Sequence, residues 1–585
     1  MTEPDSETTG EKKLRPITIG IDISTWPRCV AVWNGIQVKL FSNASNKMIM
    51  KANEPFKHPG PSVGAITTSE VSLSPGQQHD MLLKATIYNM RRMIGRIDTD
   101  PVIQASKNLP FLVQTLDIGV RPLFAARMNT AWRYTTAEQV LAVYLGRLRV
   151  MAETLLQRPV RNAVFTVPVS LNRFQLARIY YACGMAGFRV LKLLPQPTAV
   201  ALLYAHHQLQ ASSSHKDIDS GSQKTALIFN LDSGYCDVAV TAVTSEGECR
   251  MKALAGSAVG GEDLVGNMMR HLLPDSENIF KRHSDGDKEI KAMSLLRVAT
   301  LEAIHRLNYQ TSVEFDLDLG DGLKICKVVK KEEFEEVNKE VFETCQRLIS
   351  QCLRDSKVKV ERLNDVIIVG EFGNIPKVKN LVTKICIGSS KKKKGRKGKE
   401  LYNAMNPLEA ALCGATVAGA VASGIGNPLT LNLITSHITS LSLGIRANGN
   451  DFVCIIPRNT SIPIIKVMEF TTIHSKQTEA LILVYEGEGK KVEENHLLGY
   501  LKITGIPIAG KGVPRINVCM NIDDLNWLRV VVSVFMFRSQ QPVVPAMEAR
   551  MPTPVSDDAH FLHYEALNRT YGDTMDLASY SAKKE

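Results

Sequence analysis

Two strand–turn–strand segments of similar build, about 210 residues apart, most constrain how this chain can fold. The first is I-T-I-G-I-D-I-S-T-W-P-R-C-V-A-V-W (residues 17–33), and the second is A-L-I-F-N-L-D-S-G-Y-C-D-V-A-V (residues 226–240). Apolar, β-branched residues on both sides of a short acidic turn favour a β-hairpin. Two such hairpins predict two similar lobes, and turn amides that face a shared cleft are suited to binding phosphate.

The remaining pattern divides the chain of 585 residues into several units. Residues 16–430 alternate strands with amphipathic helices, which predicts α/β lobes. Residues 438–540 hold short strands between Gly- and Pro-containing turns, which predicts an antiparallel β-sandwich. We assign residues 1–15 to a disordered tail, 431–437 to a linker and 541–585 to a short tail.

The charge distribution and the cysteines limit which partners and which cellular compartment we expect for the protein. The net charge is +11, of which seven positive charges lie in K-K-K-K-G-R-K-G-K, within an expected insertion loop at 389–399. This loop is open to three interpretations: a solvated loop, a nuclear-import signal or a polyanion contact. No aromatic residues interleave with it, so we do not expect nucleic-acid binding. Scattered cysteines and the lack of a long apolar run predict a cytoplasmic protein, with nuclear localisation also open and no membrane span.

Long stretches of the chain closely resemble the 70-kDa heat-shock chaperone family, the DnaK-type chaperones. The matching pieces include N-A-V-F-T-V-P, A-G-S-A-V-G-G-E-D-L, V-Y-E-G-E and L-L-G-Y-L-K-I-T-G-I-P. The resemblance covers roughly residues 16–540. It implies an actin-like, two-lobed nucleotide-binding domain, a short linker and a β-sandwich that holds extended peptide. The family's helical lid would follow the sandwich, and we expect a short, lidless form like the truncated plant cytosolic members.

The first phosphate loop of the family departs from its pattern here. Asp22 and Thr25 match, but Ser24 replaces a glycine and Trp26 replaces a second threonine. Pro27 follows and lacks a backbone N–H donor. We therefore expect this loop to bind phosphate less well than the family's loop.

The second phosphate loop departs further. The family's Asp-Leu-Gly-Gly-Gly-Thr-Phe-Asp reads N-L-D-S-G-Y-C-D at residues 230–237. Only one of three glycines remains, so close approach of the backbone to phosphate is harder. Asp232 adds a negative charge facing an anion, and Tyr235 stands at the catalytic threonine position. Ser233, Gly234 and Asp237 are the loop residues that we expect to contact any nucleotide.

Other matched positions are also altered. Arg91 stands where the family has a catalytic lysine, and Gln196 where it has a glutamate. Together with Asn230, this change leaves Asp22 and Asp237 as the cleft carboxylates that could hold Mg²⁺, through water. Losing one positioned acid or base typically costs about 100- to 10,000-fold in rate. We therefore expect weak or absent hydrolysis, although Gly260, Gly261 and Gly370 remain for residual ATP or ADP binding.

The adenine-binding positions of the family differ as well. On one expected helix, its glutamate, lysine, arginine and serine align with Leu301, Ile304, His305 and Asn308. The family's Gly-Gly-Ser-Thr-Arg run has become G-E-F-G-N at residues 370–374, which removes the arginine that stacks on adenine. The changes at both phosphate loops and at the base clamp all predict weaker nucleotide binding.

The peptide site, by contrast, keeps its apolar character. Ile445, Phe470 and Ile482 match the family, and Ala480 stands where a valine usually lines the central pocket. The residues that arch over peptide align with Asn448 and Ile473. An extended peptide would be held there by backbone hydrogen bonds and one apolar pocket. The simpler interpretation, that these are only core residues of the sandwich, stays open.

Three functional hypotheses follow. The first is a chaperone-like protein that binds unfolded or extended polypeptide without a robust ATP cycle. The second is an active ATP-dependent folding chaperone with substituted catalytic groups, and the third is a scaffold that keeps only the fold. J-domain proteins and nucleotide exchange factors are the partners that the resemblance implies.

Overall fold

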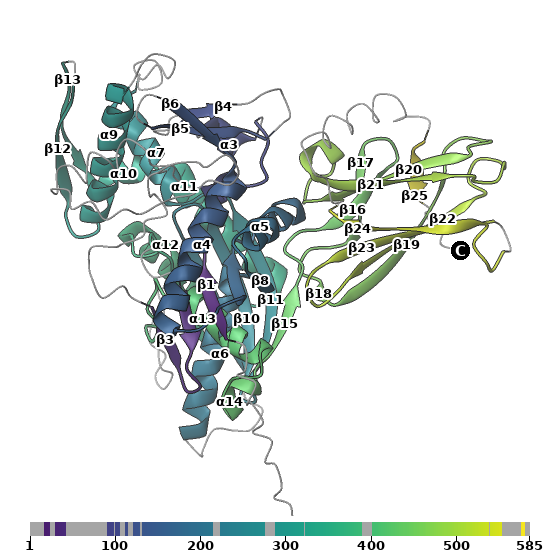
Figure 1. The fold of residues 1–585 in the computed structure, drawn as a ribbon, viewed down its shortest axis with the longest axis horizontal. Helices are drawn as coiled ribbons and strands as arrows, with labels where there is room; N and C mark the ends of the chain where they lie inside the picture. The colour runs from purple at the N-terminus through teal and green to yellow at the C-terminus, as the bar shows by residue number, and fades with distance from the viewer. Residues whose placement is uncertain are drawn as a thin grey trace, which may run out of the picture.

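The computed structural model describes residues 17–23, 30–41, 90–98, 100–105, 112–114, 121–128, 131–214, 223–274, 287–320, 322–388, 401–536, 539–552 and 575–579. Two α/β lobes lie side by side, and a β-sandwich projects from them (Figure 1). The 1–15 tail, Ser24, Thr25 and the basic 389–399 loop lie outside the described residues. The predicted class, actin-like α/β lobes followed by a β-sandwich, is confirmed.

The first lobe is built on a sheet of order β3-β2-β1-β7-β8. β1 and β2 are antiparallel and form the first predicted hairpin. β1 also pairs in parallel with β7, which follows later in the chain. A small sheet of order β4-β5-β6 lies beside it. The bounds are β1 (Thr18–Asp22), β2 (Val30–Trp33), β3 (Val38–Leu40), β4 (Leu112–Gln114), β5 (Leu123–Met128), β6 (Ala131–Thr135), β7 (Asn162–Val167), β8 (Arg189–Pro195), α2 (Met90–Met93), α3 (Pro101–Ala105), α4 (Ala137–Leu156), α5 (Arg173–Met185) and α6 (Gln196–Ser214).

The second lobe repeats the scheme around a sheet of order β14-β9-β10-β11-β15-β18. β9 and β10 form the second predicted hairpin, with the register Asn230↔Asp237 next to the turn. The bounds are β9 (Gln223–Leu231), β10 (Cys236–Thr244), β11 (Glu248–Ser257), β12 (Ser312–Gly320), β13 (Leu323–Lys330), β14 (Asp365–Val369), α7 (Gly261–Leu272), α9 (Asp287–Arg306), α10 (Lys331–Val337), α11 (Lys339–Ser356), η2 (Val360–Arg362), α12 (Pro376–Cys386), α13 (Ala410–Ala422) and α14 (Pro428–Leu431).

Helices α13 and α6 pack against each other between the two lobes. α13 packs on β1 of the first lobe, α6 packs on β9 and β10 of the second, and the small residues of α13 allow unusually close approach. A Cβ placed on Gly20 would lie 2.6 Å from the backbone nitrogen of Thr416, and one on Gly414 would lie 1.9 Å from the carbonyl oxygen of Ala199. The small-residue run therefore belongs to a buried helix between lobes. Within the part of the chain that is described, no helix combines the length and apolarity needed to cross a bilayer.

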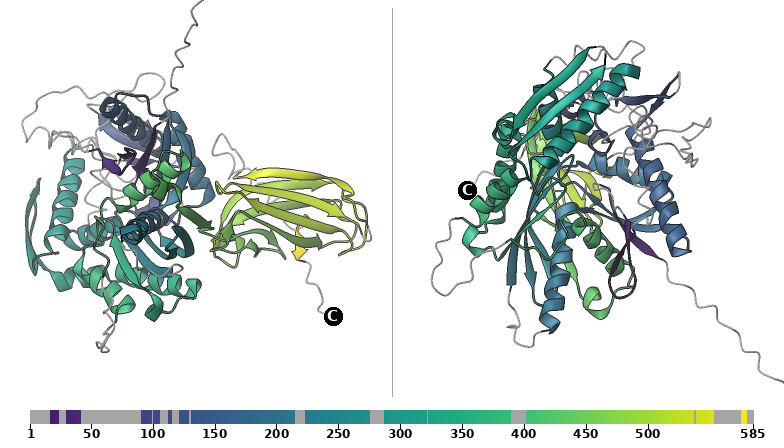
Figure 2. Two further views of the ribbon diagram at one scale, coloured as in Figure 1. Left: turned by 90° about the horizontal axis from the view of Figure 1, so that it is seen from below. Right: turned by 90° about the vertical axis from the view of Figure 1, so that its left-hand side faces the viewer.

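The β-sandwich consists of two antiparallel sheets, of order β17-β16-β20-β21 and β24-β23-β22-β19-β25. Its core is one apolar cluster between the sheets. In the left view of Figure 2, one end of the sandwich lies next to the lobes and the rest extends away from them. The bounds are β16 (Leu443–Ala447), β17 (Asp451–Ile456), β18 (Ser461–Ile462), β19 (Ile464–Thr472), β20 (Glu479–Glu486), η3 (Val492–Glu494), β21 (His496–Thr504), β22 (Arg515–Ile522), β23 (Leu528–Phe535), β24 (Val544–Met551) and β25 (Leu577–Ser579).

The sandwich extends past residue 540, where the sequence analysis placed the start of a short tail. β24 pairs with β23, and β25 pairs with β19. The prolines near β24 argue against a strand in the sequence, but β24 lies at a sheet edge, where proline is tolerated. The expected linker also takes a regular form, because β15 (Ile434–Ile438) pairs in parallel with β11 and antiparallel with β18.

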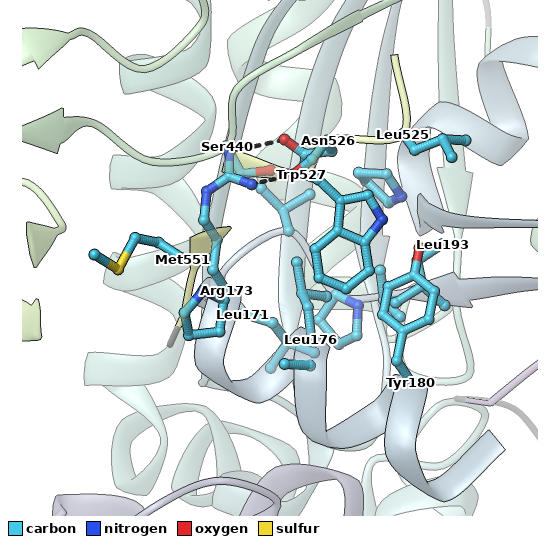
Figure 3. Close-up of a pocket in the computed structure, with 16 residues that line it drawn as sticks. Leu171, Arg173, Leu176, Tyr180, Leu193, Ser440, Leu525, Asn526, Trp527 and Met551 are labelled. Atoms are coloured by element: carbon cyan, nitrogen blue, oxygen red, sulfur yellow. Dashed lines mark hydrogen bonds between the residues drawn. The ribbon is translucent and has the colours of Figure 1, made fainter. Parts of the chain in front are cut away.

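The sandwich lies against the first lobe through a buried ion pair and an aromatic contact. Arg173, at the start of α5, lies 3.3 Å from Glu486 of β20, and both side chains are 6% exposed. Its guanidinium also donates to the carbonyl and side-chain oxygens of Asn526, and Trp527 packs on Tyr180 with 5.1 Å between ring centroids. Arg173, Tyr180, Asn526 and Trp527 are among the residues that line a pocket with about 550 Å³ of free space, open mouth included (Figure 3).

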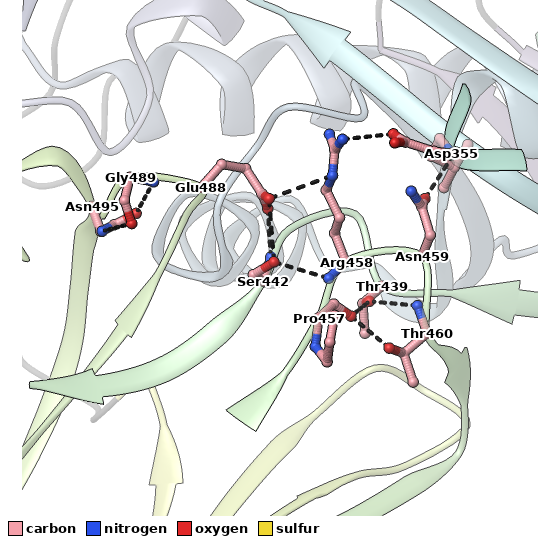
Figure 4. Close-up of polar contacts among 11 residues, drawn as sticks. Asp355, Thr439, Ser442, Pro457, Arg458, Asn459, Thr460, Glu488, Gly489 and Asn495 are labelled. Atoms are coloured by element: carbon pink, nitrogen blue, oxygen red, sulfur yellow. Dashed lines mark hydrogen bonds and ion pairs between the residues drawn. The ribbon is translucent and has the colours of Figure 1, made fainter. Parts of the chain in front are cut away.

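A second contact joins the sandwich to the other lobe. Arg458, in the loop after β17, pairs with Asp355 of α11 at 2.6 Å and with Glu488 at 3.4 Å (Figure 4). The side chain of the neighbouring Asn459 accepts from the backbone N–H of Leu254 at 2.8 Å. The sandwich is therefore held against both lobes by buried or half-buried polar contacts.

Candidate functional site

The turn between β9 and β10 places a buried acidic side chain next to residues of the first lobe. Asp232 is 2% exposed, and its carboxylate accepts from the backbone N–H of Ser233 at 3.0 Å. The guanidinium of Arg91 lies 3.8 Å from this carboxylate and donates to the Ser233 hydroxyl at 3.2 Å. The carboxylate thus already bonds a turn amide and a cation, the two kinds of group that bind anions.

Two amides lie beside Asp232 where the family has acids. Asn230 donates to the side-chain oxygen of Gln196 at 3.0 Å, and the Gln196 amide donates to Asp22 at 3.3 Å and to Asp232 at 3.4 Å. Asp22 also accepts from the Thr166 hydroxyl at 2.5 Å. We call the six residues Asp22, Arg91, Gln196, Asn230, Asp232 and Ser233 the central polar cluster. Its members bond to one another, which is the reason that these groups can be buried.

Asp237 lies opposite Asn230 in the hairpin, but its carboxylate accepts a hydrogen bond from outside the central polar cluster. It is 0% exposed, and one carboxylate oxygen accepts from the backbone N–H of Val169 at 3.2 Å. The other oxygen has no hydrogen-bond partner among the described residues. Burial raises the pKa of Asp237 well above its usual range, and the nearby negative charge of Asp232 acts in the same direction. These surroundings favour the protonated form, which is a poor ligand for a divalent cation.

Tyr235 is part of the first lobe's core rather than a side chain free in the cleft. Its ring is 1% exposed and packs in the apolar cluster of that lobe, and its hydroxyl donates to the carbonyl of Arg91 at 3.3 Å. The Tyr235 side chain therefore anchors the β9–β10 turn of the second lobe in the core of the first lobe. A threonine at this position could not make that contact.

The N-terminus of α7 is closed by the same turn. The N–H of Gly261 donates to the carbonyl of Asp232 at 2.9 Å, and the N–H of Glu262 donates to the carbonyl of Ser233 at 2.7 Å. Arg92 lies over the neighbouring Gly234 and pairs with Asp263 at 2.7 Å. A helix N-terminus can bind anions through its free amides. Here two of those amides are bonded to backbone carbonyls.

An aromatic pair fills the region matched to the base clamp. Phe372 is 3% exposed, and its ring approaches so closely that a Cβ placed on Gly261 would lie 2.1 Å from a ring carbon. His305 stacks on this ring with 5.8 Å between centroids. Ile304 is buried in the core of the second lobe, and Gly370, at φ +91°, lies against the Asn230 side chain. The region is therefore packed with protein side chains.

The residues matched to the peptide groove come together at one edge of the sandwich. Four of them are 0% exposed and share one apolar cluster with Leu577 of β25: Ile445, Phe470, Ala480 and Ile482. Asn448 is exposed at the end of β16 with φ +54°, and Ile473 directly follows β19. Asn448 and Leu577 are also hydrogen-bonded through the backbone, at 2.7 Å.

Comparison with known proteins decides the family. The model of the family described as Hsp70 protein matches residues 18–541. The chain belongs to the Hsp70 family. It is similar to Heat shock 70 kDa protein 8 of Arabidopsis thaliana, with 51% identity over 99% of this chain and 98% of that protein. Heat shock cognate 70 kDa protein 3 of Dictyostelium discoideum is 31% identical over 88% of this chain and 77% of its own length. Heat shock 70 kDa protein of Neurospora crassa is 30% identical, with 86% and 74% covered.

Membership makes this chain a chaperone-family protein, and Hsp70 proteins bind ATP or ADP with Mg²⁺ as well as unfolded polypeptide. Within the described residues, no group of three or more His, Cys, Asp or Glu side chains is arranged to hold a metal ion. Sequence reasoning anticipated the altered cleft positions but not their mutual bonds. It also missed the Arg173–Glu486 pair and the placement of Leu577, because no local pattern links residues so far apart in the chain.

Proposed function

We propose that this Hsp70 protein binds extended or unfolded polypeptide in the groove of its sandwich and does not run a robust ATP hydrolysis cycle. The observation that carries the proposal is the carboxylate of Asp232, which pairs with Arg91 and the Ser233 amide inside the cleft. A triphosphate entering there would have to displace this anion, and it would then face uncompensated negative charge.

The residues of the cleft do not fit a magnesium–nucleotide complex well. Asp22 is bonded by Thr166 and Gln196, and Asp237 is held in surroundings that favour its neutral form. Gln196 and Asn230 supply amides in place of acids, so neither can take a proton from an attacking water. Phe372 and His305 occupy the matched base region. We therefore propose that nucleotide binding is weakened.

Nucleotide binding is tested by thermal unfolding with and without MgATP or MgADP. A ligand at 100 times its Kd stabilises the native state by about 2.7 kcal/mol, so binding raises the Tm. We expect no shift at millimolar nucleotide. A single-turnover hydrolysis assay should give a rate equal to that of buffer, and a rate stimulated by a J-domain protein would support the active-chaperone alternative instead.

Polypeptide binding is tested separately, by fluorescence anisotropy with a labelled extended peptide. Saturable binding that survives the absence of nucleotide supports the proposal. Lack of binding, under conditions where the groove is free, would favour a scaffold that keeps only the fold. J-domain proteins and exchange factors stay proposed partners, and cytoplasmic or nuclear localisation is likewise a proposal that imaging of the tagged chain would decide.

A further inference from the structure

The peptide groove of the sandwich contains a segment of the same chain. Met575–Ser579 runs along the edge of β19, with the register Phe470↔Ser579, Thr471↔Ala578 and Thr472↔Leu577. Figure 1 places β25, which forms the end of this segment, next to β20. Residues 553–574 join it to β24. We call Met575–Ser579 the groove segment.

The groove segment bonds to both sheets, unlike an ordinary edge strand. Beside its pairing with β19, the carbonyl of Met575 accepts from the N–H of Leu481 in β20 at 3.0 Å. The carbonyl of Leu577 accepts from the N–H of Asn448 at 2.7 Å. An extended chain that takes backbone bonds from loops and strands on two sides is held as a peptide ligand would be.

Two apolar side chains anchor the groove segment. Leu577 is 0% exposed and belongs to the apolar core between the two sheets, the cluster that also contains Ile445, Phe470, Ala480 and Ile482. Met575 is 6% exposed and packs in a separate cluster on the same unit, with Leu483 and Tyr485 among its members. Burial of these two apolar side chains stabilises the bound segment. The anchors therefore account for a stable but reversible association.

Polar groups between and after the anchors add selectivity. The Asp576 carboxylate accepts from the N–H of Gly449 at 2.6 Å, and its backbone carbonyl accepts from Gln477 at 3.2 Å. The side chain of Asn448 exchanges two bonds with Ser579, at 3.0 and 3.1 Å. Asn448, which the family alignment places over the peptide, thus bonds the segment through its backbone and through its side chain.

We propose that the groove segment is a tethered ligand, and that its pattern, Met-Asp-Leu-Ala-Ser, marks the class of extended polypeptide that the groove accepts. This inference rests on the proposed polypeptide-binding function. The preferred client carries an aliphatic residue for the central pocket, an acidic residue immediately before it and a second apolar residue two positions before it. A client must displace the segment, so binding is competitive.

Competition within one chain is strong because the ligand is always nearby. Effective concentrations of tethered ligands reach the order of 1 mM, so a segment with a Kd of about 10 μM in trans would weaken a competitor about 100-fold. Release of the segment should therefore tighten client binding by at least about tenfold.

The test measures anisotropy of a fluorescein-labelled peptide with the sequence of residues 573–581. The full chain is compared with Leu577→Asp, which puts a charge into the apolar pocket and releases the segment. Leu155→Asp makes the same change at a half-exposed site of α4 far from the groove and serves as the matched control. We expect an apparent Kd at least about tenfold lower for Leu577→Asp and an unchanged value for Leu155→Asp.

The outcomes separate the two proposals. If full chain and Leu577→Asp bind the peptide with equal Kd, the tethered-ligand inference is overturned while the polypeptide-binding function stands. If neither binds, the polypeptide-binding function itself fails. A peptide with Asp in place of its leucine should not bind, and equal binding of that peptide would overturn the proposed client pattern.

A measurement on the unmodified chain keeps the inference testable if Leu577→Asp fails to fold. Amide hydrogen exchange of residues 575–579 should be slow in the free protein. Saturating the groove with the free peptide should speed this exchange by at least about tenfold, because the segment is displaced. Peptide binding that leaves the exchange unchanged would overturn the inference.

Discussion

The region matched to the family's nucleotide cleft and the region matched to its peptide groove are both packed with side chains of the chain itself, but in different ways. In the cleft, Tyr235 and Phe372 pack into the cores of the lobes, and Asp232 is buried against Arg91. In the groove, Leu577 belongs to the groove segment, Met575–Ser579. Along the chain, only residues 553–574 connect this segment to β24. We expect Tyr235 and Phe372 to move out only if the core of a lobe is disrupted. The groove segment, in contrast, can be displaced as a unit under our proposal.

This difference is the physical basis of the proposed function, in which nucleotide binding is weakened and polypeptide binding is kept. Side chains that became part of a core are held by the cooperativity of the fold. A segment that is held by a few backbone bonds and two anchors exchanges with competitors at a modest energetic cost. We therefore expect the cleft to be closed at equilibrium and the groove to be regulated.

We expect the largest loss of stability from a substitution at Phe372. Replacing it with alanine leaves a cavity against Gly261 and His305, which should cost about 3–5 kcal/mol of unfolding free energy. Leu577→Ala should cost less, because the loss cannot exceed the free energy that holds the groove segment in place. Denaturant titration measures both variants, with Tyr309→Ala, 92% exposed, as a control within about 0.5 kcal/mol. Equal losses for Phe372→Ala and Leu577→Ala would break the comparison.

A smaller effect is expected when an acid is restored to the cleft. Asn230→Asp removes the donor to Gln196 and buries a carboxylate near Asp22 and Asp232, so we expect a loss of about 1–3 kcal/mol. Asn364→Asp, a change of the same kind at an exposed position that precedes β14, is the control. Thermal unfolding measures the loss. Full recovery of stability on adding MgATP would show that the cleft readily accepts the complex and would contradict the proposed weakening.

The connection between the two regions should be sensitive to acid. Burial lowers the pKa of His437, in β15 of the linker, to about 3, and the positive charge of Lys192 acts in the same direction. The folded state thus disfavours the charged form, while the unfolded chain binds a proton below its ordinary pKa of about 6.5. Stability is therefore full above that pH and falls as the pH drops, by about 1 kcal/mol at pH 5.5.

Unfolding free energies at neutral and acidic pH test this effect. His206, whose pKa burial lowers to about 4, contributes in the same direction, so His437→Phe is compared with the wild type to isolate the linker histidine. The variant should lose part of the pH dependence. An unchanged dependence would show that His437 is not the titrating group.

The smallest effect is expected at Asn448. Asn448→Gly tolerates the left-handed backbone at φ +54° and removes only the two side-chain bonds to Ser579. Both bonds are exposed, so we expect the groove segment to be held less tightly by about 0.5–1 kcal/mol. Anisotropy with the 573–581 peptide would show a two- to fivefold change in apparent Kd, to be compared with Gln157→Gly, another exposed left-handed position.

The fold was largely predictable from the sequence. The hairpins around Asp22 and Asp232, the alternation of strands and helices, and the change to short strands after residue 438 each follow from local periodicity. β24 and β25 were not predicted. β24 contains a proline at an edge, and β25 is only three residues long, so neither carries a pattern that stands out locally.

The sequence by itself determined which chemical groups are available: amides in place of two cleft acids, an arginine in place of a lysine, and an apolar peptide pocket with a small residue at its centre. The tertiary structure alone decided that Asp232 lies against Arg91, that Tyr235 of one lobe packs in the other, and that Leu577 packs in the core of the sandwich. The reason is physical. Composition and spacing specify local conformation, but pairings between residues more than a hundred positions apart depend on how the lobes and sheets pack together.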